Sequence, residues 1–296
     1  MGDIIACEPI VRSLRRNNKY SSAYIIWAVK KSYKELLMYN PNIDKVIYMH
    51  CISERFMSLY KKLVDNTVDL HCFDRYCSLC TNEKNIKDDN TGISLKNFYD
   101  YGGILNAVAI KNKISLDDYQ PKMYLNKKQK NISNDLNVKN NYIIVHCLSN
   151  NKIKDWDREK WIELCVLIKE KYNYTIVEVG INPLIENDNI ALNYCGKLSL
   201  LETASIIEKS EIFIGVDSGP AHMANSFKIP GIILLGKYIG FEKYIPYTGY
   251  YLNNGAELIH ANGFVSEIKT KNVFDKFEIM HRRIKNCSDR KIQEYL

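Results

Sequence analysis

The chain has 296 residues, of which 46% are hydrophobic and 25% are charged. This composition is typical of a folded globular protein and excludes a disordered or collagen-like chain. The longest apolar runs, such as residues 232–235, are far shorter than the roughly 20 residues that a membrane-spanning helix needs. A net charge of +7 favours anionic ligands such as phosphorylated sugars, nucleotides or an anionic membrane surface.

Cysteine usage and the N-terminal residues indicate the cellular compartment. The nine cysteines are scattered along the chain, and the first residues, which include Asp3 and Glu8, form no apolar export signal. This pattern predicts a reduced, cytoplasmic protein rather than a disulfide framework. The sequence contains no helix-turn-helix, zinc-finger or RNA-binding motif, so we expect no nucleic-acid partner.

The N-terminal half shows faint alternation of strands and helices after a first helix that carries apolar residues at 7, 10, 11 and 14. Strands are predicted at 23–29, 44–49 and 68–71, and helices at 32–39, 54–65 and 96–110. A doubly wound domain normally opens with a buried strand, and none precedes Asp3. Either the first strand lies upstream of an alternative start, or it is missing from the N-terminal sheet. Residues 126–141 are rich in Lys and Asn and predict a linker, which divides the chain into domains 1–138 and 139–296.

The C-terminal half has a clearer pattern. Strands are predicted at 142–147, 174–180, 211–216 and 231–235, and helices at 158–172, 199–210, 219–227 and 273–284. Ser199 and Glu202 have the spacing of a capping box at the start of the predicted helix 199–210. Alternating strands and helices predict a parallel sheet covered on both faces, as in a doubly wound α/β fold. Two such domains would enclose a ligand cleft at the carboxyl ends of their strands.

The turn after the predicted strand 211–216 indicates an anion site. Ser218 suits a helix cap, Gly219 permits close backbone approach, and Pro220 suits the first helical turn. The free amides and the helix dipole then favour a phosphate, and Asp217 stands where it could accept hydrogen bonds from sugar hydroxyls. An ordinary capped turn explains the segment equally well, and an isolated His222 is more often structural than catalytic.

Two more residues stand at predicted strand or helix ends. Lys154 lies between the strand 142–147 and the helix that Asp157 can cap, where its ammonium could reach a phosphate. Asp3 follows Gly2 at a helix start, where a carboxylate could act as general base on an acceptor hydroxyl. A solvated loop lysine and a plain helix cap are the alternative interpretations.

Several segments, in this order, resemble glycosyltransferase family 9, the heptosyltransferases. The matching segments are residues 2–5 with 9–16, 40–47, 154–156 with Trp161, 196–200, 215–224 and 230–236. The match extends over roughly residues 2–245. The Asp-Ser-Gly-Pro-x-His segment at 217–222 is fairly specific, and the ordered set is more specific than any single motif.

The resemblance implies a GT-B fold with two Rossmann-like domains, the N-terminal one binding the acceptor and the C-terminal one, with its final helix, binding a nucleotide-sugar donor. It implies an inverting transferase that needs no cofactor and no metal, using ADP-heptose and a lipopolysaccharide core or similar glycan, in possible peripheral contact with the inner membrane. By the same resemblance, Asp3 is the general base and Lys154 neutralises the donor phosphates. Donor binding would involve Ser149 and Asn150 near the phosphates, Glu186 at the ribose, Leu198 at the base, Asp217 at the sugar, Ser218 and Gly219 in the phosphate turn, and His222 in support.

Two other interpretations of the whole chain stay open at this point: a catalytically inactive relative that binds a nucleotide sugar, and another GT-B enzyme such as a nucleotide-sugar epimerase. A local alternative concerns Cys72, Cys77 and Cys80 with His71. The Cys-x-x-Cys spacing suits zinc, whereas free thiols suit a reduced compartment.

Overall fold

The computed structural model describes residues 1–49, 61–71, 91–135, 141–237 and 244–293. The chain forms two compact units, the first made of Met1–Asn126 with Ile239–Gly249, and the second of Lys127–Tyr238 with Tyr250–Leu296. The first change of unit therefore comes at residue 126, earlier than the expected boundary at 138. The last segments of the chain return to each unit in turn, which no pattern in the sequence had indicated.

A six-stranded parallel sheet forms the centre of the second unit, with strand order β5-β4-β3-β6-β7-β8. Its strands are β3 (Tyr142–His146), β4 (Thr175–Glu178), β5 (Leu192–Asn193), β6 (Ile212–Val216), β7 (Gly231–Leu235) and β8 (Ala256–His260). Every residue of β3, β6 and β7 is buried, which explains their continuous apolar runs, since a parallel sheet is covered on both faces. The four predicted strands are confirmed, whereas β5 and β8 were not predicted.

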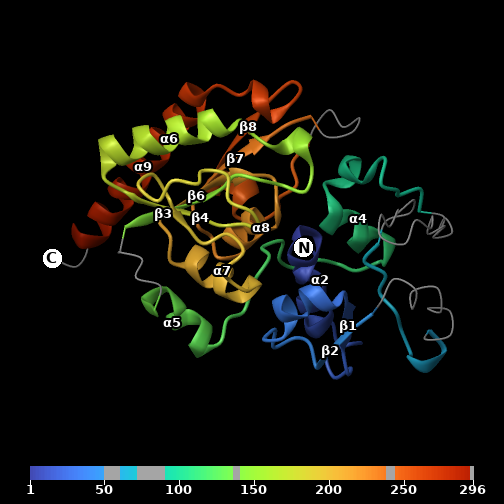
Figure 1. Ribbon diagram of the computed structural model, residues 1–296. Helices are drawn as coiled ribbons and strands as arrows, with labels where there is room; N and C mark the ends of the chain where they lie inside the picture. Colours follow the sequence, from blue (N-terminus) through green and yellow to red (C-terminus); the bar gives the residue numbers. More distant parts are fainter. Residues whose placement is uncertain (50–60, 72–90, 136–140, 238–243, 294–296) are drawn as a thin grey trace. The chain divides into compact units, whose positions relative to one another are not determined.

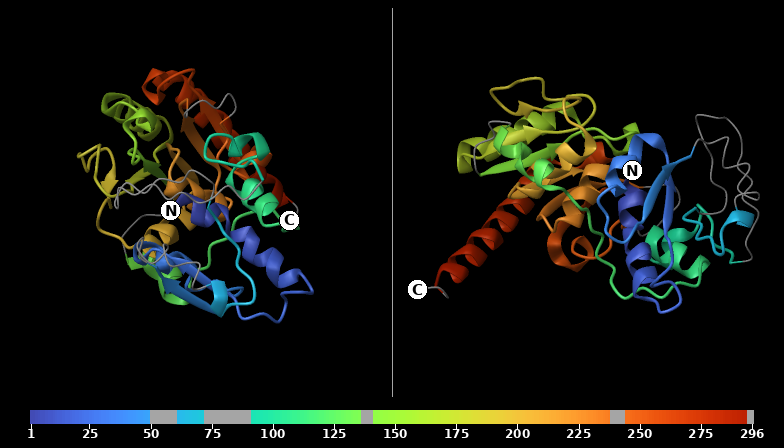
Figure 2. Two further views of the ribbon diagram at one scale, coloured as in Figure 1. Left: turned by 90° about the vertical axis from the view of Figure 1, so that its right-hand side faces the viewer. Right: turned by 90° about the horizontal axis from the view of Figure 1, so that it is seen from below.

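Helices cover both faces of this sheet (Figure 1). Helices α6 (Arg158–Tyr172) and α9 (Thr270–Gln293) lie on one face, and α7 (Leu200–Glu208) and α8 (Gly219–Ser226) lie on the other. Helix α9 is much longer than the predicted 273–284, and its C-terminal half projects past the sheet (Figure 2). This arrangement confirms the doubly wound α/β architecture predicted for the C-terminal half.

The segment expected to be a linker contains a helix, α5 (Lys127–Asp135). Helix α5 packs against α7, and the hydroxyl of Ser205 donates a hydrogen bond to the carbonyl of Gln129. The Lys- and Asn-rich composition of residues 127–135 therefore marks a solvated helix rather than only a connection. Polar composition predicts exposure, and exposure is shared by linkers and by surface helices.

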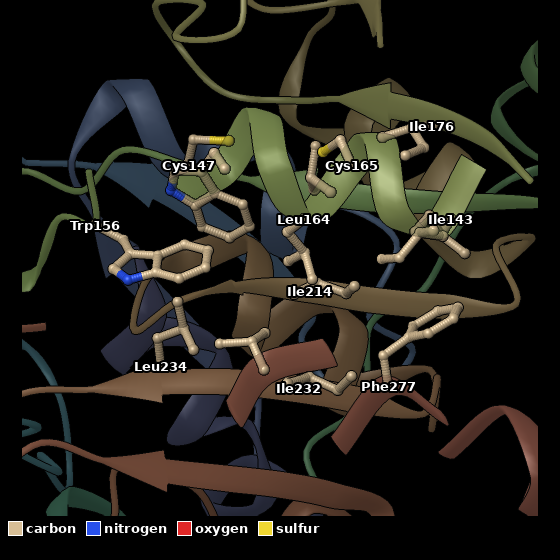
Figure 3. Close-up of a cluster of buried hydrophobic side chains, with 14 of the residues drawn as sticks. Ile143, Cys147, Trp156, Leu164, Cys165, Ile176, Ile214, Ile232, Leu234 and Phe277 are labelled. Atoms are coloured by element: carbon tan, nitrogen blue, oxygen red, sulfur yellow. The ribbon is translucent and has the colours of Figure 1, made fainter. Parts of the chain in front are cut away.

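A hydrophobic core lies between the sheet and α6, and the loop before α6 packs into it. Leu164 and Cys165 of α6 lie over Ile143 and Ile214 of the sheet (Figure 3). Trp161 packs edge to face against Trp156, with ring centroids 5.1 Å apart. The indole of Trp156, in the loop before α6, is 2% exposed, and its Nε1 donates to the carbonyl of Ile268 at 2.8 Å. This tryptophan anchors its loop in the core.

The described part of the first unit has two parallel strands, β1 (Ile26–Val29) and β2 (Lys45–Tyr48). Its α-helices are α1 (Gly2–Ala6), α2 (Glu8–Arg16) and α4 (Ile104–Lys111), and its 3₁₀ helices are η1 (Lys31–Leu37), η3 (Lys61–Leu63) and η4 (Phe98–Tyr101). The first predicted helix and the predicted strands around 26–29 and 45–48 are confirmed, and the helix expected at 32–39 is a 3₁₀ helix.

Two predictions for this unit are wrong. Residues 68–71 form no strand. The helix expected at 96–110 is interrupted, because Gly102 and Gly103 adopt φ angles of +89° and +93° and separate η4 from α4. Most of the helix expected at 54–65 lies outside the described residues.

A buried ion pair anchors α2. The Nε of Arg12 lies 2.9 Å from Oε2 of Glu8, and the two side chains are 5% and 2% exposed. Nη1 of Arg12 also lies 2.5 Å from Oδ2 of Asp118, while Glu8 accepts hydrogen bonds from Asn40 and Tyr124. Each buried charge therefore has partners that offset its desolvation.

Candidate active site

The turn from β6 into α8 begins a helix at the predicted place, but the expected side-chain cap by Ser218 is not formed. Asp217 follows the last residue of β6 and is 8% exposed. Ser218 is the N-cap residue in an extended conformation, with φ −162° and ψ 174°, and Pro220 lies in the first turn of α8. The hydroxyl of Ser218 makes no capping bond, is buried, and has no hydrogen-bond partner among the residues that the structure describes. The first amides of α8 also lack partners within the helix, so this turn can bind an anion.

Lys154 and Asp217 form an ion pair although 63 residues separate them. Nζ of Lys154 lies 2.6 Å from Oδ2 of Asp217, and the side chains are 16% and 8% exposed. Lys154 is the last residue of a short 3₁₀ helix, η5 (Lys152–Lys154), which follows β3. Because β3 and β6 are neighbours in a parallel sheet, their carboxyl ends meet at one edge and bring the two residues together.

The loop after β3 is closed by hydrogen bonds. The hydroxyl of Ser149 donates a hydrogen bond to the backbone carbonyl of Asn151 at 2.7 Å and accepts one from the backbone amide of Asn151 at 3.0 Å. The amide of Ser149 donates to Oδ1 of Asp155 at 2.6 Å. Asn150 lies exposed at the bend between them. Ser149 and Asn150 thus belong to the same loop as Lys154, as the sequence predicts, but sequence reasoning missed Asp155, whose only signal was its place next to Lys154.

The expected ribose and base residues lie in the loops that follow β4 and β5. Glu186 is exposed and has a φ of +47°. Its loop is held from the interior by Glu178, a residue that is 1% exposed and accepts from the amides of Leu184 at 2.7 Å and Ile185 at 3.2 Å. Leu198 is half-buried and directly precedes the N-cap of α7.

The α7 cap is the predicted capping box. The amide of Ser199 donates to Oε2 of Glu202 at 2.8 Å, and the amide of Glu202 donates to the hydroxyl of Ser199 at 3.3 Å. This reciprocal pair fixes the backbone immediately after Leu198. The position of Leu198 at the carboxyl edge of the sheet is therefore set by a local signal that the sequence carries.

Two histidines lie under this edge. His222 of α8 is 5% exposed. His146, the last residue of β3, is 6% exposed, and its Nδ1 lies 2.7 Å from the carbonyl oxygen of Val179. Burial lowers the pKa of His146, although the Val179 carbonyl and the charge of Asp155 oppose that shift. A neutral ring that donates Nδ1–H to the carbonyl fits this environment and supports the site structurally.

Asp3 belongs to the first unit. It is exposed near the start of α1, a five-residue helix, and its carbonyl accepts the amide of Cys7 at 2.9 Å. The residues that the structure brings together are therefore those expected at the donor phosphates and sugar: Lys154, Asp217, Ser218 and the Ser149 loop.

No group of three or more His, Cys, Asp or Glu residues in the described segments is arranged to hold a metal ion. Cys72, Cys77 and Cys80 lie outside the described residues. His71 is described, and its Nδ1 lies 2.9 Å from Oδ1 of Asp69. Cys7, Cys147, Cys165 and Cys195 are buried free thiols.

Comparison with known proteins identifies a family that part of this chain matches. Residues 104–239 match the family model described as glycosyltransferase family 9 (heptosyltransferase). The resemblance to glycosyltransferase family 9 is confirmed. A segment of 120 residues is 28% identical to lipopolysaccharide heptosyltransferase 3 of Escherichia coli (strain K12). That alignment covers 37% of this chain and 35% of the relative, so the chain matches about a third of the relative's length.

Solved structures extend the likeness in fold over nearly the whole chain. A glycosyltransferase family 9 protein from Veillonella parvula superposes with a TM-score of 0.69 at 16% identity, covering 94% of this chain and 93% of the other. E. coli ADP-heptose lipopolysaccharide heptosyltransferase II gives a TM-score of 0.65 at 16% identity, covering 96% of both chains. An E. coli heptosyltransferase in complex with ADP gives 0.60 at 14% identity, covering 96% and 95%. These neighbours confirm the GT-B fold.

Within the described residues, none of the helices combines the length and the apolar character needed to cross a membrane.

Proposed function

We propose that this protein is an inverting glycosyltransferase that moves a heptose or a related sugar from a nucleotide-diphosphate sugar to a glycan acceptor. The observation that carries the proposal is the Lys154–Asp217 ion pair, 2.6 Å long, beside the buried hydroxyl of Ser218 at the start of α8. A cation, free helix amides and an unbonded hydroxyl at one point suit a diphosphate, and a carboxylate next to them suits the sugar that the diphosphate carries.

The chemistry of transfer assigns a task to each group. The bond between the anomeric carbon and the diphosphate oxygen breaks, and negative charge develops on the leaving diphosphate. Lys154 and the amides at the start of α8 stabilise that charge, and preorganised stabilisation of this kind is usually the largest single contribution to catalysis. The acceptor oxygen forms the new bond from the opposite face, and its proton passes to the carboxylate of Asp3.

The donor that we propose is ADP-heptose. The support is the match of residues 104–239 to the heptosyltransferase family, and the fold shared with heptosyltransferases whose names include ADP-heptose or whose structures contain ADP. Glu186 and Leu198, in the loops after β4 and β5, would contact the ribose and the base, while Ser149, Asn150 and Gly219 would approach the phosphates. His222, a residue of α8, would support the site structurally.

The acceptor that we propose is a lipopolysaccharide core or a similar glycan, reached in the cytoplasm with peripheral contact at the inner membrane. The heptosyltransferase relative that shares 28% identity is a lipopolysaccharide enzyme by name, which motivates this choice. The net charge of +7 is consistent with a glycolipid acceptor at an anionic surface.

The test is an incubation of the full chain with ADP-heptose and a set of truncated lipopolysaccharide cores. Release of ADP together with a product that gains one heptose by mass spectrometry supports transfer. Tight ADP binding by calorimetry without transfer to any acceptor would indicate an inactive binding relative. An altered nucleotide sugar without a new glycosidic bond would instead indicate an epimerase. Lys154→Met serves as the matched inactive variant.

A further inference from the structure

The loop after β3 contains a carboxylate whose position is fixed from two sides. Asp155 follows Lys154 and precedes Trp156, and its Oδ1 accepts the amide of Ser149 at 2.6 Å across the loop. On the other side, Asp155 is followed by Trp156, whose buried indole donates a hydrogen bond to the carbonyl of Ile268 at 2.8 Å. The carboxylate of Asp155 therefore connects the start of the loop to a residue that is anchored in the core.

The bond from Asp155 closes a continuous set of contacts that ends at Lys154. Ser149 exchanges two hydrogen bonds with the backbone of Asn151, at 2.7 and 3.0 Å. Oδ1 of Asn151 accepts the amide of Ile153 at 3.2 Å, and its carbonyl accepts the amide of Lys154 at 2.8 Å. The conformation of the backbone that carries the Lys154 side chain thus depends on where Ser149 is held.

We propose that Asp155 is a positioning residue for donor binding, and that its bond to the Ser149 amide holds the 149–154 loop in the conformation that presents Lys154 and Ser149 to a diphosphate. This inference rests on the proposed function. Asp155 itself does not touch the donor. Its role is to keep the loop ordered before the ligand arrives, which reduces the entropy that binding would otherwise cost.

Electrostatics indicate that the carboxylate acts through geometry and not through charge. A negative charge beside a diphosphate site weakens anion binding. What Asp155 contributes is therefore a hydrogen-bond acceptor at one point in space. Asparagine has an oxygen in the same place and no charge, so it can replace this acceptor.

The experiment compares Asp155→Asn and Asp155→Ala with the wild-type chain, using ADP and inorganic pyrophosphate as probes in calorimetry and ADP-heptose turnover as a second readout. Asp155→Ala should weaken the binding of both probes about 10-fold, because the loop loses the contact that orders it. Asp155→Asn should bind both probes at least as tightly as wild type. The loss in Asp155→Ala should appear in KM more than in kcat, because the chemical groups are unchanged.

Asp157→Ala is the matched control. Asp157 is two residues further along and has the same charge, but its side chain is 46% exposed and pairs with Lys160 at 2.7 Å. This variant should bind both probes like wild type. If Asp157→Ala weakens binding as much as Asp155→Ala does, the loss does not depend on the bond between Asp155 and the Ser149 amide, and the proposal is overturned.

Hydrogen exchange on the wild-type chain tests the same bond without any substitution. The Ser149 amide should exchange much more slowly than the amide of the neighbouring exposed Asn150, and equal rates would overturn the proposal. Wild-type binding by Asp155→Ala, or equal losses in Asp155→Ala and Asp155→Asn, would also overturn it. These outcomes differ from failure of the proposed function, in which the wild-type chain itself would bind neither ADP nor pyrophosphate.

Discussion

Replacing Lys154 by methionine removes the charge of the proposed phosphate-binding cation and keeps most of its side-chain volume. Nζ of Lys154 lies 2.6 Å from Oδ2 of Asp217. At that separation the Coulomb attraction is about 6 kcal/mol at an effective dielectric constant of 20 and about 1.6 kcal/mol at 80. Desolvation of the two ions offsets much of this attraction, so we expect a coupling energy of about 1–3 kcal/mol.

The substitution has two consequences for a bound diphosphate. The favourable charge is lost, and the carboxylate of Asp217, 8% exposed, remains beside the phosphates without its lysine. We expect kcat/KM to fall about 10²- to 10³-fold, the usual effect of deleting one preorganised group that stabilises developing charge. Adding Asp217→Asn to Lys154→Met should then recover about 5- to 30-fold in ADP affinity, because it removes the remaining repulsion.

Calorimetric titration of ADP into the wild type, both single variants and the double variant closes the cycle. Lys154→Met should weaken ADP affinity, whereas Asp217→Asn alone should leave it unchanged or strengthen it. Thermal unfolding of each variant sets a temperature at which all four are folded. Turnover of Lys154→Met within about threefold of wild type, or affinities of Lys154→Met and the double variant that agree, would refute the role of this pair.

Three more substitutions test other parts of the structure. Ser218→Ala should leave the free energy of unfolding unchanged or slightly raised, since its hydroxyl is buried and has no hydrogen-bond partner among the described residues, and should weaken ADP binding about 10-fold in calorimetry. Arg12→Met should lower the free energy of unfolding by about 3–5 kcal/mol in urea titrations, because Glu8 is 2% exposed and loses its ionic partner, whereas Lys271→Met at an exposed pair should change it little. Burial raises the pKa of Asp69, but the hydrogen bond and charge of His71 and the charge of Lys111 outweigh it and lower the pKa from 3.8 to about 2. The ionised form is favoured in the folded state, so its stabilisation is complete above pH 3.8 and is lost as the pH falls through about 2. Asp69→Asn should therefore have a lower free energy of unfolding than wild type near neutral pH and the same value at about pH 2, as measured by urea titration. If the two proteins are equally stable at both pH values, the lowered pKa of Asp69 is contradicted.

The features of the second unit that the sequence predicted are those with local causes. The buried strands β3, β6 and β7 are continuous β-branched and leucine-rich runs, and the capping box at Ser199 uses a short-range residue pattern. The sequence placed Lys154 and Asp217 each at the end of a predicted strand. Their ion pair was not predicted, because it depends on β3 and β6 being neighbours in the sheet.

Features that depend on tertiary context were missed. Helix α5 has a polar composition, and what stabilises it is packing against α7, including the bond from Ser205 to Gln129, which no local pattern shows. Strand β5 has two residues and pairs only with β4, so its extent is set by its neighbour. Strand β8 has no fully buried residue and lacks the apolar run that marked the central strands.

Asp155 shows most clearly why the site could not be completed from the sequence. Its carboxylate accepts a hydrogen bond from the Ser149 amide, six residues earlier in the chain. The next residue, Trp156, is held by a hydrogen bond to Ile268, which lies far along the chain. Lys154 was recognisable because a lysine at a strand end has a direct use at a phosphate, whereas a carboxylate in the same place has an unfavourable charge. The presence of Asp155 is explained only when the loop geometry is known. The same reasoning applies to Glu178, which accepts hydrogen bonds from the loop that carries Glu186. In this unit the residues proposed to contact a ligand are suggested by their chemistry, while the residues proposed to position them are identified by their partners.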